Sequence, residues 1–199
     1  MIVLGLTGSI GMGKSTTAQM FREAGIPVWD ADATVHALYG PGAAGSEALR
    51  AIAPDAVTDE GVDRTTLREA IIADPTLLKK IEAAIHPLVG QDRGAFLWQA
   101  EKDGHAIVLC DIPLLFEGGA EQWLDKVLVV TAPPEVQRQR VLDRPGMTEE
   151  AFQTILSKQV PDAVKRQKAD YVIDTSLGME NARAEVARII AELKELRRA

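Results

Sequence analysis

The chain has 199 residues, of which 46% are hydrophobic and 26% charged, with a net charge of −7 and one cysteine. This length and composition are typical of a single globular domain. The lack of a long apolar run argues against a membrane span. The acidic balance argues against nucleic acid, because phosphate backbones are bound by basic surfaces. We therefore expect a cytoplasmic protein with no membrane or nucleic-acid partner, a monomer with an oligomer as the alternative.

A phosphate-binding motif stands near the start of the chain. Residues 8–15 read Gly-Ser-Ile-Gly-Met-Gly-Lys-Ser and fit the pattern G-x-x-x-x-G-K-[ST]. The apolar run before it, residues 2–6, predicts a buried parallel strand. The helical pattern after it, from about Ser15 to Ala24, ends at Gly25, a natural C-terminal cap. A strand, a glycine loop and a helix in this order predict a loop that binds a nucleoside triphosphate.

The chemistry of such a loop explains the residue types. Backbone N–H groups surround the phosphates, glycines let the backbone approach closely, and the helix dipole favours negative charge. Lys14 is expected to reach the β- and γ-phosphates, and Ser15 to hold Mg²⁺. The residues of this segment assigned to ATP are Gly11, Met12, Gly13, Lys14, Ser15 and Thr16.

Five short apolar runs predict the strands of a parallel sheet covered on both faces. They span residues 2–6, 27–29, 106–110, 126–130 and 171–173, and are rich in Val, Ile and Leu without regular alternation. Helical stretches between them indicate βαβ units, and therefore an α/β fold. The last segment, about 178–198, carries a helical apolar stripe: Ala182, Val186, Ile189, Ile190, Leu193 and Leu196.

The spacing of the strands predicts subdivisions within one domain, residues 1–199. About seventy-five residues separate the second and third strands, far more than a simple crossover needs. We expect a helical substrate insertion over residues 31–104, with helices near 46–52, 65–73 and 76–85. The last helix is expected to end at His86-Pro87, because proline ends helices.

The residues outside the insertion are assigned to a nucleotide-binding core and a basic segment. Residues 1–30, 105–137 and 169–199 are predicted to form the nucleotide-binding core. In residues 138–168, basic side chains outnumber acidic ones. We interpret this segment as a lid that closes over polyphosphate, with a solvated helix pair as the alternative.

Three acidic residues follow strands at the edge where open α/β sheets bind ligands. Asp32 can orient an acceptor hydroxyl and take its proton, while Asp30 caps the following helix. Asp111 is expected to support Mg²⁺ through a water molecule, or else to be an ordinary turn residue. Together with the loop after Leu6, these residues are expected to meet in one crevice.

Two arginines and one histidine are further candidates for the site, and each has two interpretations. Arg140 and Arg144 are expected on one face of a helix after the fourth strand, where guanidinium groups suit phosphate oxygens and the charge that develops in transfer. The alternative is a solvated helix surface. His86 suits either an anionic substrate or the C-terminal end of a helix dipole.

Taken in order, segments along nearly the whole chain resemble the dephospho-coenzyme A kinase family. The matching segments are residues 6–16, Asp30-Ala31-Asp32, Asp63-Arg64 with Leu67, His86-Pro87, Asp111-Ile112-Pro113-Leu114-Leu115-Phe116-Glu117, then Arg140, Arg144, Gln159 and Lys165, and finally residues 169–174. The chain departs from the family pattern at Ser9, Met12, Ala53-Pro54 and Thr175, where an asparagine often follows the last strand.

The resemblance implies a P-loop kinase core with a five-stranded parallel sheet, an inserted helical substrate domain and a small helical lid. It implies Mg²⁺-dependent transfer of the γ-phosphoryl group of ATP to the 3′-hydroxyl of dephospho-coenzyme A. The implied catalytic residues are Asp32 as general base, Lys14 and Arg140. Arg144 would bind ATP, and the implied substrate-side residues are Arg64, His86 and Leu114.

Two other functions remain open from the residues. One is a kinase for another small acceptor, such as a nucleoside or nucleotide. The other is a nucleotide-dependent switch, although the Asn-Lys-x-Asp element of guanine-specific switches does not occur in the sequence.

Overall fold

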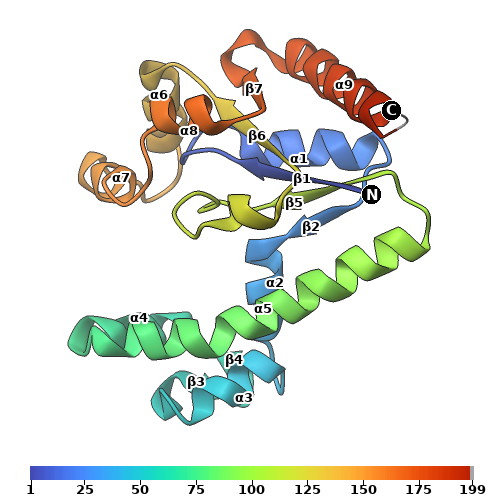
Figure 1. The fold of residues 1–199 in the computed structure, drawn as a ribbon. Coiled ribbons are helices and arrows are strands. Elements are labelled where there is room, and N and C mark those ends of the chain that lie inside the picture. Colours follow the sequence, from blue (N-terminus) through green and yellow to red (C-terminus); the bar gives the residue numbers. More distant parts are fainter. Residues whose placement is uncertain (198–199) are drawn as a thin grey trace. The chain divides into compact units, whose positions relative to one another are not determined.

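The computed structural model describes residues 1–197. It divides into two compact units (Figure 1). The first unit consists of Met1–Trp29 and the chain from Ala100 onward, and the second unit is Asp30–Gln99. None of the described helices is long and apolar enough to cross a membrane.

A five-stranded sheet organises the chain, in the order β2-β5-β1-β6-β7. The strands are β1 (Ile2–Thr7), β2 (Val28–Asp30), β5 (Ile107–Asp111), β6 (Lys126–Thr131) and β7 (Tyr171–Asp174). Strand β1 pairs in parallel with β5 and β6, and β6 pairs in parallel with β7. The predicted parallel sheet is confirmed, and each strand end lies within one residue of expectation. The order puts β1, which leads into the phosphate loop, at the centre.

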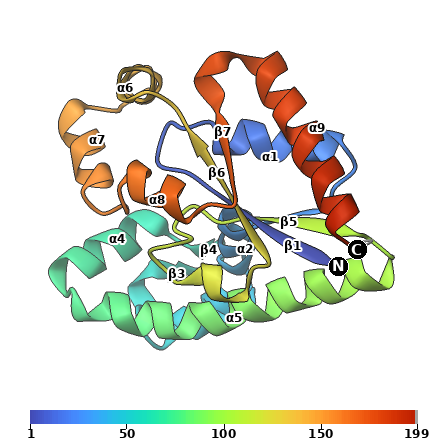
Figure 2. The ribbon, with the colours of Figure 1, turned by 45° about the horizontal axis from the view of Figure 1, so that its top comes forward.

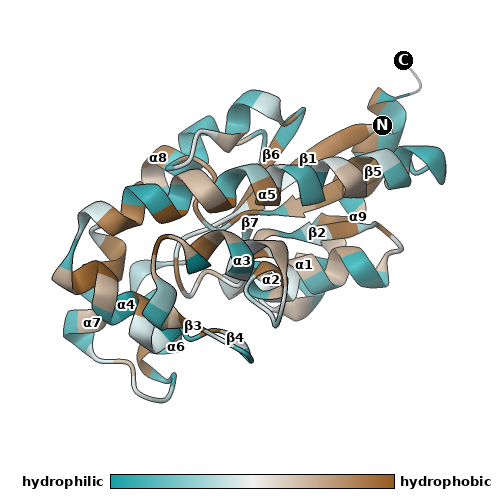
Figure 3. Cartoon of the chain, turned by 90° about the horizontal axis from the view of Figure 1, so that it is seen from below, coloured by the Kyte–Doolittle hydropathy of each residue, from teal (hydrophilic) through white to brown (hydrophobic). Residues whose placement is uncertain are grey.

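Apolar residues cover both faces of this sheet. In β6, Leu128 and Val130 belong to one core, while Val127 and Val129 belong to another. Because successive strand residues point to opposite faces, β6 has a packed layer on each side. Brown, hydrophobic residues run along β1 and β5 in Figure 3.

Two helices of the first unit supply the layer that contains Leu128 and Val130. Helices α1 (Lys14–Glu23) and α9 (Met179–Leu196) contact each other and the sheet, as Figures 1 and 2 show. Gly25 has φ +78°, which confirms the predicted cap after α1. The apolar stripe of α9 is buried as predicted except at Leu196, which is 52% exposed. Arg198, in the predicted last helix, lies outside the described residues.

Shorter elements connect the later strands. They are η2 (Ala120–Trp123), α6 (Pro134–Leu142), α7 (Glu149–Leu156), α8 (Asp162–Lys168) and η3 (Thr175–Leu177). Helix α8 packs on β6. The segment 138–168 therefore contains most of α6 and all of α7 and α8.

The second unit has its own core. It contains α2 (Ala31–Leu38), α3 (Ala44–Arg50), η1 (Pro54–Ala56), the antiparallel pair β3 (Val57–Thr58) and β4 (Gly61–Val62), α4 (Arg64–Ala73) and most of α5 (Thr76–Lys102). Its buried apolar residues are Leu49, Ala53, Ala56, Leu67, Ile81 and Ile85. The short strands were not predicted from the sequence.

The predicted helix end at His86-Pro87 is wrong. Helix α5 continues through Pro87 to Lys102. Proline removes one hydrogen bond to the carbonyl four residues earlier, but both Pro87 and Ala83 are exposed, so water can hydrate that carbonyl. Apolar contacts on both sides, from Ile85 before the proline and Leu88 after it, hold the helix to the core of its unit.

Candidate active site

The phosphate loop depends on glycines at two positions. Gly11 has φ +78° and Gly13 has φ +89°, in the left-handed region that other residues adopt at a cost. A Cβ atom on Gly11 would also lie 2.5 Å from Val141 Cγ2. Gly13 occupies the N-cap of α1 and provides no capping side chain. The first N–H groups of α1 are therefore left for another acceptor, an arrangement suited to phosphate.

Lys14 and Asp111 form an ion pair beside this loop. Lys14 Nζ lies 2.6 Å from Asp111 Oδ1, and the Asp111 side chain is only 3% exposed. The pair forms because β1 and β5 are neighbours, with Leu6 opposite Asp111 in the register. Ser15 and Thr16 are exposed on the first turn of α1. The structure thus places a hydroxyl and a carboxylate near the end of the loop.

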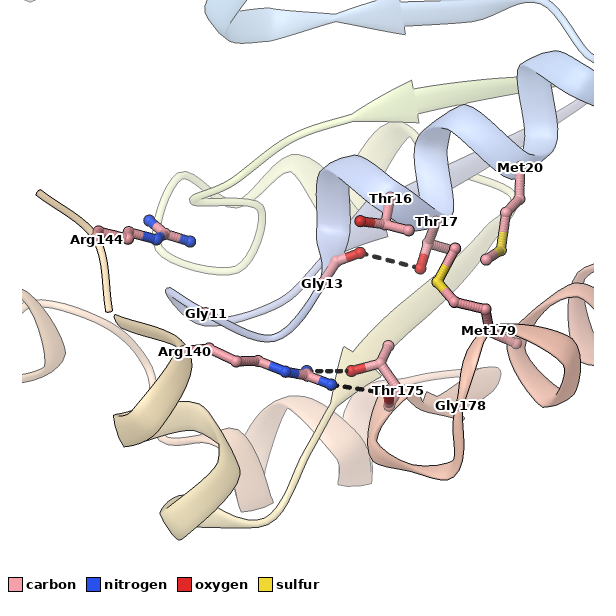
Figure 4. A pocket seen from close by; sticks show the side chains of 11 residues that line it. Gly11, Gly13, Thr16, Thr17, Met20, Arg140, Arg144, Thr175, Gly178 and Met179 are labelled. Atoms are coloured by element: carbon pink, nitrogen blue, oxygen red, sulfur yellow. Dashed lines mark hydrogen bonds between the residues drawn. The ribbon is translucent and has the colours of Figure 1, made fainter. Parts of the chain in front are cut away.

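A cavity of about 250 Å³ lies next to the loop, within the first unit. Five of the predicted site residues line it: Gly11, Gly13, Thr16, Arg140 and Arg144. Figure 4 shows the two arginines on one side and the side chains of α1 and Met179 on the other. The cavity joins the predicted phosphate-binding residues to the loop and helix that follow β7.

Arg140 is held in the wall of the cavity by Thr175. Its two terminal nitrogens donate to Thr175 Oγ1 at 2.8 Å and to the Thr175 carbonyl at 2.9 Å (Figure 4). Thr175 Oγ1 also lies 2.9 Å from the Met12 carbonyl oxygen, within donating distance. Sequence reasoning gave Thr175 no role, although its place after the last strand, at the ligand edge of the sheet, was a usable signal.

The prediction that Arg140 and Arg144 share one helix is wrong. Helix α6 ends at Leu142, with Asp143 as its C-cap. Arg144 precedes Pro145, and proline disfavours a helical residue before it. Both arginines nevertheless line the same cavity, Arg144 from the turn that follows the helix.

In the second unit, the two aspartates at the junction of β2 and α2 occupy different positions. Asp30 is the N-cap of α2, and its Oδ1 accepts a hydrogen bond from the Ala33 N–H at 3.0 Å. The predicted capping role of Asp30 is therefore confirmed. Asp32 lies in the first turn of α2 and is exposed.

Arg64 belongs to a small cluster in the second unit. One of its terminal nitrogens lies 3.4 Å from His36 Nδ1, and its guanidinium lies 5.6 Å from the centre of the Tyr39 ring. Burial raises the pKa of Tyr39, and the Arg64 charge partly opposes this shift. His36 was not singled out, although it follows Asp32 by one helical turn. His86 is exposed on α5.

The loop after β5 places Leu114 at the surface. Leu114 is 51% exposed, whereas its neighbour Leu115 is fully buried in the core beneath the sheet. Thr7 Oγ1 donates to the Pro113 carbonyl at 3.0 Å, which ties this loop to the end of β1. Among residues 1–197, no group of three or more His, Cys, Asp or Glu side chains is arranged to hold a metal ion.

Comparisons with known proteins show the family and the fold of the chain. The sequence model of the family described as dephospho-CoA kinase matches residues 2–181. A dephospho-CoA kinase of Mesorhizobium japonicum is 58% identical, with 98% of each chain covered. A solved structure of a Thermus thermophilus protein has a TM-score of 0.82 at 34% identity, covering 96% of this chain and 97% of that one. A Campylobacter jejuni dephospho-CoA kinase, with a TM-score of 0.68 at 24% identity and 97% of each chain covered, shares the fold.

Proposed function

Because the chain belongs to the dephospho-CoA kinase family, we propose that it transfers the γ-phosphoryl group of ATP to the 3′-hydroxyl of dephospho-CoA. The products are CoA and ADP. The observation that carries the proposal is the cavity of the first unit, in which a phosphate loop meets Arg140 and Arg144. This combination of backbone donors and guanidinium groups suits a triphosphate.

The first unit would bind the nucleotide and stabilise charge. Backbone N–H groups of residues 11–16 and the Lys14 ammonium would contact the phosphates, and Arg140 would neutralise the charge that develops on the transferred group. Arg140 acts from a fixed position, because Thr175 holds two of its nitrogens. Phosphoryl transfer needs positioning and charge stabilisation more than covalent chemistry from the protein.

Mg²⁺ fits the residues at the end of the loop. Hydroxyl and carboxylate oxygens are suitable partners for this ion. Ser15 would hold it directly, and the buried carboxylate of Asp111 would hold it through water. When bound, the ion would reduce the negative charge of the phosphates. Within the chain, Asp111 also orients Lys14, whose ammonium lies 2.6 Å away.

The second unit would contribute the acceptor side. Asp32 would orient the 3′-hydroxyl and accept its proton, since Asp30 already serves as a helix cap. Arg64 and His86 of this unit would contact dephospho-CoA, together with Leu114 of the first unit. Residues 138–168 would close as a lid that keeps water from the γ-phosphate. The enzyme would work as a cytoplasmic monomer.

A coupled assay of ADP release tests the proposal. We expect turnover with dephospho-CoA and MgATP, with the product phosphorylated at the ribose 3′-oxygen, and background release without an acceptor. Nucleosides and nucleoside monophosphates serve as competing acceptors in parallel reactions. Turnover of a nucleoside monophosphate but not of dephospho-CoA would overturn the substrate assignment. ATP binding without turnover of any acceptor would favour a nucleotide-dependent switch.

A further inference from the structure

Two glutamine side chains hold the phosphate loop from outside the cavity. Gln159 Oε1 accepts a hydrogen bond from the Ile10 N–H at 3.1 Å, and Gln137 Nε2 donates to the Ile10 carbonyl at 2.7 Å. Both backbone groups of Ile10 are therefore paired with side chains. Ile10 lies inside the loop, directly before Gly11.

Each glutamine is itself fixed by its surroundings. Gln137 lies on α6 and is only 6% exposed. Gln159 follows α7, next to Val160, whose N–H donates to Glu117 Oε1 at 2.7 Å. Glu117 Oε1 lies 2.9 Å from Lys165 Nζ, and the Lys165 side chain is fully buried. The loop after β5 and helix α8 thus fix the backbone next to Gln159.

The loop needs such support because its own sequence makes it flexible. Gly11 and Gly13 can adopt many backbone conformations, and only some of them point the loop N–H groups at a phosphate. A protein that spends part of its time in other conformations binds more weakly, in proportion to the fraction that is competent. Hydrogen bonds to both sides of Ile10 raise that fraction.

We propose that Gln137 and Gln159 are positioning residues that hold the phosphate loop in its nucleotide-binding shape. Gln159 itself does not line the cavity, so it would influence the affinity for ATP through the loop and without touching the nucleotide. This inference rests on the proposed function in one respect, that the loop binds ATP. It does not depend on the identity of the acceptor.

The two glutamines have opposite hydrogen-bonding roles, so the same substitution should affect them differently. Gln159 accepts and Gln137 donates. Glutamate preserves an acceptor but has no donor when ionised. Methionine has a similar length, no donor and only a weak acceptor. Gln159→Glu should therefore retain the bond to the Ile10 N–H. Gln137→Glu should lose its bond and place a carboxylate against a carbonyl oxygen.

The test measures ATP binding by calorimetry without acceptor, followed by the KM for each substrate and kcat. We expect Gln137→Met, Gln137→Glu and Gln159→Met to weaken ATP binding about tenfold, as expected for a lost hydrogen bond to a buried polar group. The KM for ATP should rise, while the KM for dephospho-CoA stays unchanged. Gln159→Glu should bind ATP nearly as the unaltered chain does. Measurements at low and high salt separate the effect of the charge that Gln159→Glu adds from the effect of the hydrogen bond.

Gln139→Met and Gln153→Met are matched controls, because these exposed glutamines bond to side chains four residues away, Asp143 at the end of α6 and Glu149 in α7, and not to the phosphate loop. They should leave ATP binding unchanged. Unchanged ATP affinity in both Gln137→Met and Gln159→Met would overturn the proposal, as would equal losses in Gln159→Glu and Gln159→Met. An unaltered chain that binds ATP but does not phosphorylate dephospho-CoA would overturn the proposed substrate and leave this inference standing.

Discussion

Asp30 and Asp32 show how position separates two identical side chains. Asp30 precedes α2, so its carboxylate is used by the Ala33 N–H. Asp32 lies within the first turn, where its exposed carboxylate does not serve as the helix cap. The two aspartates belong to one short motif but differ in role. Asp30 has a structural role as the helix cap, and Asp32 is the residue that we propose as catalytic.

Asp32→Asn tests the catalytic proposal. The amide cannot accept a proton from the acceptor hydroxyl, so kcat should fall by about 10²–10⁴-fold. The affinity for ATP should change by less than about twofold, because the phosphate loop is untouched. Steady-state kinetics and calorimetry measure the two quantities.

Asp30→Asn is the matched control for this substitution. Asparagine is as good an N-cap as aspartate, so turnover and stability should stay near those of the unaltered chain. Near-normal turnover in Asp32→Asn would remove this residue from its proposed role.

At the scale of elements, a buried ion pair joins α8 to the loop after β5. Lys165 is fully buried and Glu117 is 15% exposed, with their charged atoms 2.9 Å apart. Burial acts to raise the pKa of Glu117, but the hydrogen bonds from Lys165 and from backbone N–H groups outweigh it, and the net pKa lies below the usual value. A lowered carboxyl pKa stabilises the fold above the unfolded pKa. That contribution is lost as the pH falls through the folded pKa.

Lys165→Met should destabilise the protein by about 3–5 kcal/mol, because it leaves a buried carboxylate without its partner. Adding Glu117→Gln should recover part of this loss, so the double variant should cost less than the sum of the single ones. The double variant should also lose less unfolding free energy between neutral and acidic pH than the unaltered chain. Urea unfolding at several pH values measures these free energies.

Lys168→Met is the control on the same helix, because Lys168 is 52% exposed. Its contacts with Glu121 and the Phe116 ring are those of an exposed side chain, so the unfolding free energy should change by about 1 kcal/mol or less. Additive costs for the two single substitutions at Lys165 and Glu117 would contradict the coupling.

For the whole molecule, the proposed function assigns ATP to the first unit and most of the dephospho-CoA contacts to the second. Lys14 and the cavity belong to the first unit, and Arg64 to the second. A ligand that binds only the folded state stabilises it by about 2.7 kcal/mol at a concentration of 100 Kd. ATP should therefore raise the melting temperature through residues such as Lys14, and dephospho-CoA through residues such as Arg64.

Thermal unfolding with each substrate tests this division. MgATP should raise Tm, and Lys14→Ala should remove that increase while leaving the effect of dephospho-CoA. Arg64→Ala should remove the increase in Tm caused by dephospho-CoA and leave the increase caused by MgATP. Removal of Mg²⁺ with a chelator should reduce the increase caused by ATP. An equal loss of both ligand effects in Arg64→Ala would contradict the assignment.

Local patterns were sufficient for much of the fold. The five strands, α1 and most of the helices follow from apolar runs, helical spacing and caps, which depend on neighbouring residues. The error at Pro87 occurred where packing contacts outweigh local preference, whereas the error at Arg144 has a local cause, the proline that follows it. Pro87 lies inside α5 because apolar packing on both sides holds the helix. Leu196 is exposed although it continues the apolar stripe of α9.

The residues of the candidate site also include some that local patterns predict and others that they do not. The phosphate loop could be predicted from local residues, since a glycine pattern between a strand and a helix is typical of phosphate binding, and motifs spread along the chain predicted the family. The side chains that support that loop could not be predicted in this way, because they come from distant parts of the chain. Thr175 reaches Arg140 and Met12, Gln137 and Gln159 meet at Ile10, and Lys165 pairs with Glu117. These residues are far apart in the chain, and their hydrogen bonds exist only because strand order and helix packing bring them together.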